Sequence, residues 1–399
     1  MVFLAKAGAE AVEHRRLSEA ASCLGDARRL AKEHGHLLGE PAYWHLYDLS
    51  LLNGDLAGAA QLLDDLAVEA ECPELVELER LFLDLQTHPE RAAGVQDAAR
   101  RIRAATPGAA RSTVLRCALR SGQAGMMLDD FAAASADVDE AAAAATITSP
   151  LAVVPAFAGA ALASVHGPDP VPTAIARCEG LLARLAPGEL LTGAAVTLPL
   201  AVLLAMSDRA RQAEQLLDQV DEVAAGLDLA ELTTSAAHFR AAVYEIEERH
   251  SDALGAYRRA LGASAIGQDE SEAGAGYIRA LIGLGRTREA VAHSAPWVFT
   301  GPSATRFALP DRGLAARVCL LRGDDGAAHD LARSAMAQAL ASSSLSGAGL
   351  ALLESSAVLR SLGERSRADT AVRGAVQKFA RKRDLPGLRR AHRLMRRDP

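Results

Sequence analysis

Apolar residues recur along the chain at the spacing of one helix face. Leu62, Leu63 and Leu66 form one such stripe, and Leu216 and Leu217 belong to another. Residues three or four positions apart lie on the same side of an α-helix, so each stripe predicts a helix that buries one face. The sequence contains no convincing strand pattern. It therefore predicts an all-α fold.

The predicted helices come in pairs. The first helix of each pair is expected, in chain order, at 41–53, 74–87, 110–121, 151–165, 189–206, 229–249, 271–285, 310–322 and 347–362. A partner helix follows each of them. Loops are expected at Gly262–Asp269 and at Thr300–Pro310, where glycine or proline interrupts the helical pattern.

A short motif recurs at the junction between the two helices of a pair. It consists of an apolar helix end, a glycine or polar turn, and an alanine about five residues later. Clear copies centre on Ala59, Ala290, Ala328 and Ala368, weaker ones on Ala20, Ala213 and Ala253, and degenerate ones on Ala93, Ala132 and Ala174. Nine steps separate Ala20 from Ala368, which gives about 39 residues per unit.

Each part of the motif has a physical role. Glycine in the turn supplies the left-handed conformation that ends a helix. The acidic residue after Gly54, Gly323 or Gly363 favours the positive end of the next helix dipole. The alanine lets the two helices approach closely. A single hairpin cannot bury its apolar stripe alone, so neighbouring hairpins must stack, and we predict an α-solenoid of about ten hairpins.

The domain organisation follows from this repeat. Residues 1–380 are assigned to the array, with a mild break near 186–189, where Pro187 and Gly188 interrupt the pattern. Residues 381–399 are assigned to a basic C-terminal helix that caps the array.

The motif resembles the tetratricopeptide repeat (TPR), which has a small residue before the turn and an alanine early in the second helix. Tyr244, nine residues before Ala253, and Tyr257, four after it, occupy large-residue positions of that consensus. The spacing exceeds the usual ~34 residues. The chain is more similar to the alanine-rich TPR-like arrays of bacterial signal-transducing ATPases that end in a LuxR-type helix-turn-helix. The resemblance implies a TPR-like superhelix whose first helices line a concave binding surface.

Composition indicates closely packed helices and a cytoplasmic location. Alanine supplies 86 of 399 residues, and aromatic residues only 4%. The five cysteines form no CxxC pair, which indicates free thiols in a reducing compartment. The longest apolar stretches, Pro150–Val165 and Ala194–Met206, are too short to cross a bilayer. We expect a cytoplasmic protein that makes no membrane contact and needs no metal or cofactor.

The net charge of −7 is unevenly distributed. Residues 373–399 carry +8, which leaves −15 on residues 1–372. The acidic part repels nucleic acid, so we expect no nucleic-acid binding through this chain. Nucleic-acid binding remains an alternative only at the basic C-terminal end. Leucines and alanine at helical spacing run through that end, which favours a capping helix with its cations in solvent.

The sequence lacks the common catalytic motifs. A P-loop needs a lysine after glycine, whereas the four lysines follow Ala5, Ala31, Gln377 and Arg381. GxSxG and HExxH are also absent. We therefore expect a protein that is not an enzyme of these classes.

Candidate binding residues come from counting back from the anchor alanines to the first helices. This places Trp44 and Asp48 on the concave surface, and the same offsets select His238, Glu245, Arg279 and Arg317. Arg279 and Arg317 are predicted to form a basic ladder for a carboxylate-bearing peptide or a small anionic ligand, or else to pair with nearby acidic residues. Trp44 is either a ligand platform or part of the packing.

The main functional hypothesis is a non-catalytic scaffold, the sensor or partner-binding region of a bacterial transcriptional or signalling regulator. A free-standing adaptor is a close variant. An enzyme with its site in the groove is the alternative, with His238 and Glu245 transferring a proton. The expected partner is a protein, a peptide or a small anionic ligand, and a homodimer is compatible with this reading.

Overall fold

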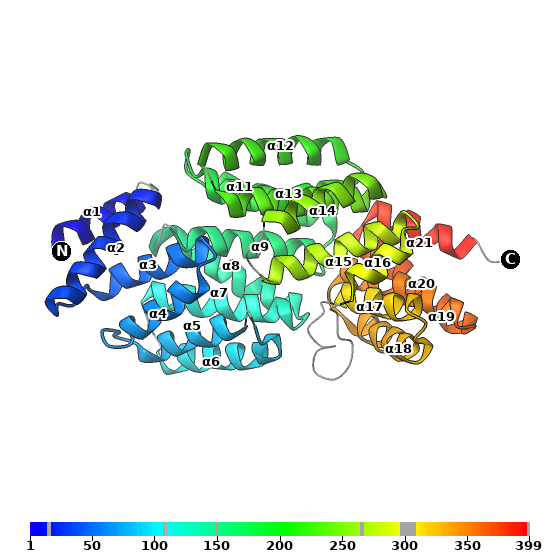
Figure 1. Cartoon of the computed structure of the whole chain (residues 1–399), viewed down its shortest axis with the longest axis horizontal. Helices are drawn as coiled ribbons and strands as arrows, with labels where there is room; N and C mark the ends of the chain where they lie inside the picture. Colours follow the sequence, from blue (N-terminus) through cyan, green and yellow to red (C-terminus); the bar gives the residue numbers. More distant parts are fainter. Residues whose placement is uncertain are drawn as a thin grey trace. The chain divides into compact units, whose positions relative to one another are not determined.

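The computed structural model describes residues 1–13, 17–85, 87–106, 108, 110–148, 151–227, 229–263, 267–295 and 309–396. Within these ranges the regular structure is entirely helical, with 21 α-helices and one 3-10 turn and no strand (Figure 1). The expected all-α class is confirmed. None of these helices is long and apolar enough to span a membrane.

The chain divides into two compact units. Unit 1 comprises Met1–Gly125 and Ala136–Gly159, and unit 2 comprises Met126–Ser135 and Ala160–Pro399. The break expected at 186–189 lies inside unit 2.

The helices up to α9 are α1 (Val2–Glu13), α2 (Leu17–His34), α3 (Glu40–Leu52), α4 (Leu56–Leu66), α5 (Pro73–Leu85), η1 (Pro89–Arg91), α6 (Ala92–Ala105), α7 (Arg111–Met127), α8 (Phe131–Thr148) and α9 (Val153–His166). The boundaries between the units fall within α7, α8 and α9. Unit 2 continues with α10 (Val171–Ala183), α11 (Leu190–Met206), α12 (Ala210–Leu227), α13 (Ala230–Ile246), α14 (His250–Ala263), α15 (Gly267–Gly283), α16 (Thr287–His293), α17 (Leu309–Leu321), α18 (Asp325–Ala341), α19 (Leu345–Ser361), α20 (Arg365–Lys382) and α21 (Leu385–Arg396).

The nine first helices expected from the sequence correspond to the odd-numbered helices α3 to α19. The helix expected at 110–121 continues to Met127, and the one expected at 229–249 ends at Ile246. Of the loop expected at Gly262–Asp269, residues 267–269 begin α15, and 264–266 lie outside the described residues. Most of the expected loop Thr300–Pro310 also lies outside them.

Eight of the ten predicted anchor alanines have no exposed surface: Ala20, Ala59, Ala174, Ala213, Ala253, Ala290, Ala328 and Ala368. Each is the fourth residue of its helix. At that position a side chain points back over the first turn toward the partner helix, so only a small one permits close approach.

The two other anchors were assigned wrongly. Ala93 and Ala132 are exposed, and the fourth residues of α6 and α8 are Val95 and Ala134, both fully buried. Both anchors were placed two residues too early. Ala134 lies five residues after the left-handed Asp129, at the same distance as Ala213 from Asp208, and in the other repeat η1 precedes α6.

Seven of the turns between paired helices use the left-handed conformation, as expected, whereas the turn between α9 and α10 does not. Glycine occupies it at Gly54, Gly285, Gly323 and Gly363, with φ between 70° and 85°. Asp55 and Asp324 then cap the second helices by accepting hydrogen bonds from Gly58 N (2.8 Å) and Ala327 N (3.0 Å). Three turns differ because an acidic residue takes the left-handed position: Asp129 (φ 62°), Asp208 (φ 63°) and Glu248 (φ 58°).

Glycines within helices allow further close contacts. A Cβ on Gly276 of α15 would lie 2.1 Å from Cζ of Tyr257, and one on Gly349 of α19 would lie 2.6 Å from the ring of Phe379. Both rings are buried. These two large side chains therefore fill the core where the facing helix has no side chain.

The C-terminal end of α9 receives a lysine from the far end of unit 2. Lys382 Nζ is fully buried and donates hydrogen bonds to the carbonyl oxygens of Ser164 (2.8 Å) and Gly167 (2.9 Å). A cation at this position complements the negative end of the helix dipole. Burial, together with the charge of Lys382, lowers the pKa of the neighbouring His166 to about 4.

We expect Ala59→Leu to destabilise the protein by about 1–3 kcal/mol, because the larger side chain must enter a filled interface between α3 and α4. Ala93→Leu is the matched control on an exposed helix position and should change the free energy of unfolding by less than about 0.5 kcal/mol. Urea unfolding of the two variants tests this. Equal effects would contradict the assigned anchor role.

We expect His166→Phe to reduce the acid sensitivity of the fold. His166 stays neutral in the folded protein down to about pH 4, whereas in the unfolded chain it takes up a proton below its ordinary pKa of 6.5. Stability is therefore lost as the pH falls from about 6.5 toward 4, by about 1–2 kcal/mol at pH 5. Phenylalanine cannot take up the proton and can still contact Phe131, 5.4 Å away.

The measurement is urea unfolding at pH 7 and pH 5. The drop in free energy of unfolding between the two should be smaller for His166→Phe than for the unsubstituted protein. His36→Phe, at an exposed histidine, is the control and should keep the full drop. The same drop in all three proteins would contradict the prediction.

Candidate binding site on the first helices

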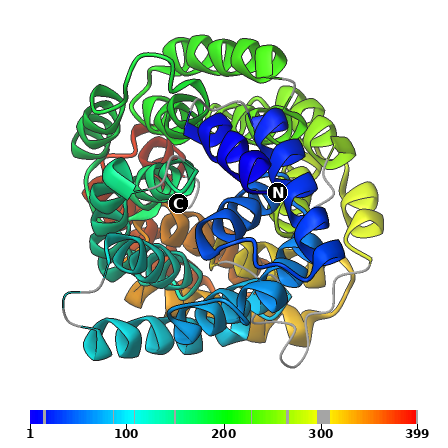
Figure 2. The same cartoon turned by 90° about the vertical axis from the view of Figure 1, so that its left-hand side faces the viewer.

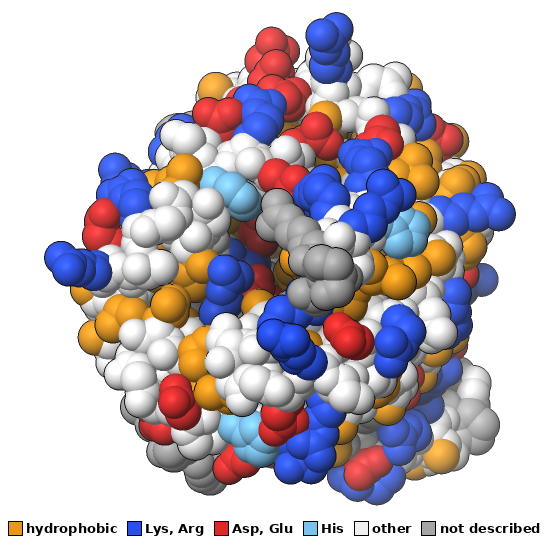
Figure 3. All heavy atoms as spheres, turned by 90° about the vertical axis from the view of Figure 1, so that its right-hand side faces the viewer, with side chains coloured by type: hydrophobic (Ala, Val, Ile, Leu, Met, Phe, Trp, Pro, Cys, Tyr) orange, Lys and Arg blue, Asp and Glu red, His pale blue; other side chains and the backbone are white. Residues whose placement is uncertain are grey.

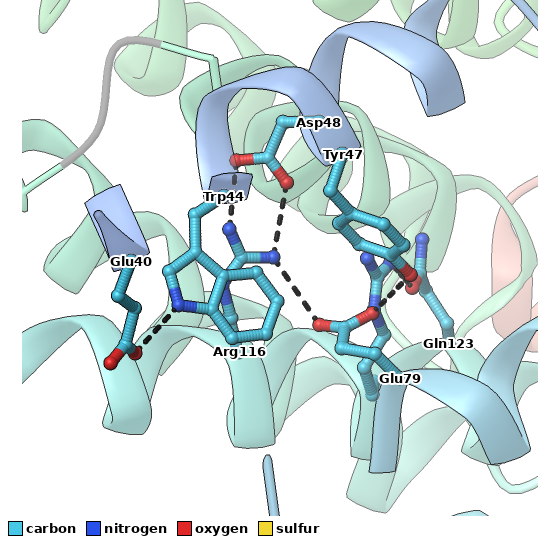
Figure 4. Close-up of polar contacts among 8 residues, drawn as sticks. Glu40, Trp44, Tyr47, Asp48, Glu79, Arg116 and Gln123 are labelled. Carbon is cyan, nitrogen blue, oxygen red and sulfur yellow. Dashed lines mark hydrogen bonds and ion pairs between the residues drawn. The ribbon is translucent and has the colours of Figure 1, made fainter. Parts of the chain in front are cut away.

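Three first helices of unit 1 place aromatic and charged side chains in one cluster (Figure 4). Its members are Trp44, Tyr47 and Asp48 from α3, Glu79 from α5, and Arg116 and Arg120 from α7. The residues from α3 and those from α7 are three or four positions apart, so each set lies on one face of its helix. We call this group the α3–α5–α7 cluster.

Arg116 and Glu79 connect the cluster. Arg116 Nη1 and Nη2 donate to the two carboxylate oxygens of Asp48, at 3.0 and 2.9 Å, and Nη1 also lies 3.4 Å from Glu79 Oε1. Glu79 Oε2 accepts from Arg120 Nε (2.8 Å) and from the Tyr47 hydroxyl (2.7 Å). The paired bonds between Arg116 and Asp48 fix both distance and orientation.

The charges in this cluster are buried and balanced. The Glu79 side chain has no exposed surface, and those of Asp48, Arg116 and Arg120 are at most 9% exposed. Burial alone would raise the pKa of Glu79, but the charges of Arg120 and Arg116 and the Tyr47 hydrogen bond outweigh it, so the pKa is lowered. Glu79 therefore stays ionised between two guanidinium groups.

Trp44 lies at the edge of the cluster and is held on several sides. The Arg116 guanidinium lies 4.0 Å from its ring centroid, Tyr47 meets it edge-on at 5.9 Å, and its Nε1 donates to Glu40 Oε1 at 2.9 Å. The residue is only partly buried, although it also packs against two apolar clusters of unit 1. Trp44 is therefore a rigid aromatic surface that remains accessible from outside the cluster.

A second cluster lies on the first helices of unit 2. Glu245 of α13 accepts from Arg279 Nε of α15 (2.6 Å) and from the hydroxyl of Tyr257 (2.8 Å). Arg279 Nη1 also donates to Asp311 of α17 at 2.7 Å. The side chains of Glu245, Arg279 and Asp311 are between 10% and 14% exposed. Arg279 is therefore held between two carboxylates.

The predicted basic ladder is made of paired arginines. Besides the two partners of Arg279, Arg317 Nη1 lies 2.8 Å from Glu354 of α19. The structure thus shows the alternative that the sequence left open, in which these arginines pair with acidic residues. Arg317 is the more accessible of the two, at 35% exposed against 14% for Arg279.

Glu245 and His238 are arranged around the ring of Tyr257. His238 meets that ring at 5.9 Å, and Tyr257 donates to Glu245 on its other side. Burial would raise the pKa of Glu245, but the charge and hydrogen bonds of Arg279 and the hydrogen bond of Tyr257 lower it. A carboxylate that is engaged in this way is a poor acceptor for a substrate proton.

The structure groups the six predicted residues into two places and one separate pair. Trp44 and Asp48 meet in unit 1, Glu245, Arg279 and His238 gather around Tyr257 in unit 2, and Arg317 forms its own ion pair. Sequence reasoning missed Glu79, Arg116, Arg120 and Asp311. The available signal was a charge inside an apolar stripe, as for Glu79 between Leu78 and Phe82.

Metal binding finds no support in the described part of the chain, where no three His, Cys, Asp or Glu side chains come together as a ligand set. The basic C-terminal segment predicted as one helix over 381–399 is divided: Arg381 and Lys382 end α20, and α21 begins at Leu385. Arg389, Arg390 and Arg393 of α21 face acidic side chains of unit 2. Figure 3, which faces the C-terminal end, shows acidic side chains lying among the basic ones.

Comparison with known proteins identifies the fold but no family. No family model matches the chain, and no curated protein is detectably similar in sequence. A Rap protein complexed with competence and sporulation factor superposes with a TM-score of 0.60 at 14% identity, over 86% of this chain and 98% of that one. The apo form of the quorum sensor NprR from B. thuringiensis gives 0.46 at 11% identity, over 84% and 96%. The Rap superposition shows a TPR-like superhelical fold.

We expect Glu79→Gln to destabilise the protein by about 3–5 kcal/mol, because two buried guanidinium groups would then share one carboxylate. The substitution keeps the volume of the side chain, so the loss reports charge. Glu77→Gln on the same helix removes an exposed ion pair with Arg80 and should cost less than about 1 kcal/mol. Urea unfolding at pH 7 compares the two. A similar small loss for both would show that the buried charges contribute little.

Proposed function

We propose that this chain is a non-catalytic scaffold that binds a peptide, or an extended segment of a protein, along the first-helix face of unit 1. The observation that carries the proposal is that the ring of Trp44 is fixed in position and yet partly exposed. Arg116, Tyr47 and Glu40 hold its ring in place, yet the side chain is only half-buried. An aromatic side chain that is rigid before binding loses little entropy when a partner covers it.

The repeat supports an elongated ligand. Successive first helices present their side chains in a row, and solenoids use such rows as extended binding surfaces. Around Trp44, residues from α3, α5 and α7 contribute to one continuous cluster. A peptide that runs across these helices would meet each of them in turn.

The charges favour an apolar or aromatic anchor over a carboxylate. Within the α3–α5–α7 cluster, two arginines face Asp48 and Glu79, so no net positive charge remains to bind an anion. Arg279 is balanced in the same way by Glu245 and Asp311. We therefore propose that an apolar or aromatic side chain of the partner packs on Trp44, and that a small anionic ligand is the weaker alternative.

The solved structure of similar fold supports a role in signalling. The Rap protein was crystallised with competence and sporulation factor, which is a binding function performed on this architecture. We extend this to a binding role in a regulatory system for the present chain. The more specific proposal of a sensor region from a LuxR-type regulator rests on the repeat resemblance alone.

Several features support a non-catalytic role. The carboxylate of Glu245, the proposed proton acceptor of the enzyme alternative, is occupied by Arg279 and Tyr257, and its pKa is lowered. The sequence contains none of the common nucleophile or nucleotide motifs.

The test uses a displayed random peptide library selected against the full chain, followed by calorimetry with the selected peptides. We expect the selected peptides to share an apolar or aromatic residue. Trp44→Ala should weaken their binding at least about tenfold, as loss of an aromatic hot spot does. Arg100→Ala, at an exposed arginine of the second helix α6, is the matched control and should leave binding unchanged.

The stability of each variant is measured alongside binding, so that loss of fold is not read as loss of affinity. Selected peptides that bind Trp44→Ala as tightly as the unsubstituted protein would overturn the placement of the site. A selection that yields no binding peptide would overturn the peptide-binding function.

A further inference from the structure

The turns that carry an acidic residue in place of glycine are distributed unevenly in the chain. In a non-glycine residue the left-handed conformation costs roughly 1 kcal/mol, which is why glycine is favoured there. Asp129, Asp208 and Glu248 accept this cost, at φ 62°, 63° and 58°. All three lie in unit 2. The turns at Asp208 and Glu248 bond to α21, and the turn at Asp129 bonds to Ser343, just before α19.

Two of the acidic residues bind arginines of α21 directly. Arg389 makes two bonds to the carboxylate of Asp208, with Nη2 2.6 Å from Oδ1. Arg393 Nη2 lies 2.6 Å from Glu248 Oε1, and Arg390 Nε lies 3.2 Å from the same oxygen. The carboxylates therefore have a role at these turns that glycine could not fill.

Polar contacts from the start of α19 and the end of α20 also reach earlier parts of unit 2. Ser343 Oγ, just before α19, donates to the carbonyl oxygen of Asp129 at 3.1 Å. Lys382 Nζ, at the end of α20, binds the carbonyl oxygens of Ser164 and Gly167. Figures 1 and 2 show the red C-terminal helix α21 beside green helices of the same unit.

The two sides of α21 differ in chemistry. Its apolar residues Leu388, Ala391 and Leu394 pack with α19 and α20, so this side continues the repeat array. Its arginine side makes the contacts with the earlier turns, and the side chains of Arg389 and Arg393 are 55% and 48% exposed. Exposed ion pairs are individually weak and are screened by salt.

We propose that α21 is a reversible latch, which closes unit 2 by docking its arginines on the acidic turn residues Asp208 and Glu248. Helices α19 and α20 stay folded through their apolar contacts with one another, while the docking of α21, and with it part of the protection of its amides, depends on charge. This inference goes beyond the proposed peptide-binding function and does not require it.

The latch is linked to the second cluster through one residue. Arg390 Nη2 donates to the carbonyl oxygen of Glu245 at 3.0 Å, and the carboxylate of the same residue holds Arg279. Undocking of α21 removes a contact from the last turn of α13. The conformation of the α13–α17 surface and the position of α21 are therefore coupled.

The same contacts use part of the positive charge of the C-terminal end. Arg389, Arg390 and Arg393 neutralise acidic turns of the same unit, which leaves fewer cations for an external polyanion.

The test is a double substitution, Asp208→Gly with Glu248→Gly, studied by hydrogen exchange of the full chain with mass spectrometry. Glycine suits the left-handed turn, so the thermal midpoint should not fall. Amides of α21 should exchange about tenfold faster, since two ion pairs are lost. In 0.5 M NaCl the unsubstituted protein should approach the variant, and the variant should change little.

Two controls separate docking from general loosening. Glu289→Gln removes an exposed ion pair with Arg286 at the start of α16 and should leave exchange in α21 unchanged. The charge swap of Asp208→Arg with Arg389→Asp should restore part of the protection that Asp208→Arg alone removes.

Unchanged exchange in α21 for the glycine variant would overturn the latch. So would an increase spread evenly over all helices, since that reports global stability. Neither outcome bears on peptide selection at Trp44, which lies in unit 1.

Discussion

Close approach between the two helices of each pair is the constraint on which the rest of this structure depends. The fourth residue of nearly every second helix is a buried alanine, and in seven pairs the first helix ends in a turn that takes the left-handed conformation. An interior built from such small side chains gains little area per residue, so the hairpins must stack on their neighbours to bury enough apolar surface. The stacking brings first helices of successive repeats into contact, and the proposed binding surface lies there.

Contact between first helices has an electrostatic consequence. Charged side chains such as Glu79, Arg116 and Arg279 become buried and must be paired. Once paired, these side chains are not available as free charges to bind a ligand. The pairing also fixes the position of neighbouring side chains. Arg116 helps to hold the ring of Trp44 in place, so in the proposed function the buried charges act by positioning this aromatic side chain. A scaffold organised in this way offers a partner a rigid aromatic surface with a neutral surrounding.

Turn chemistry carries information that helix packing does not. Glycine is the lowest-energy solution for the left-handed position, and four turns use it. Where Asp208 or Glu248 replaces it, the turn is less favourable by itself and the carboxylate contacts an arginine about 145 to 181 positions away in sequence. The unfavourable backbone conformation of Asp208 and Glu248 is thus accompanied by an ion pair between their carboxylates and arginines of α21. The basic C-terminal helix, which looks from its composition like an anion-binding tail, is the other participant.

The sequence by itself determined the helix class, the pairing of helices, the positions of nine first helices and eight of ten anchor alanines, because these depend on local periodicity and on turn residues. It also placed Trp44 and Asp48 on the first-helix face. Only the tertiary structure decided which charges meet: Asp48 with Arg116, Glu245 with Arg279, and Asp208 with Arg389. Those partners are between 34 and 181 residues apart, and a periodic pattern specifies a face of a helix but not the side chain that faces it across the packing.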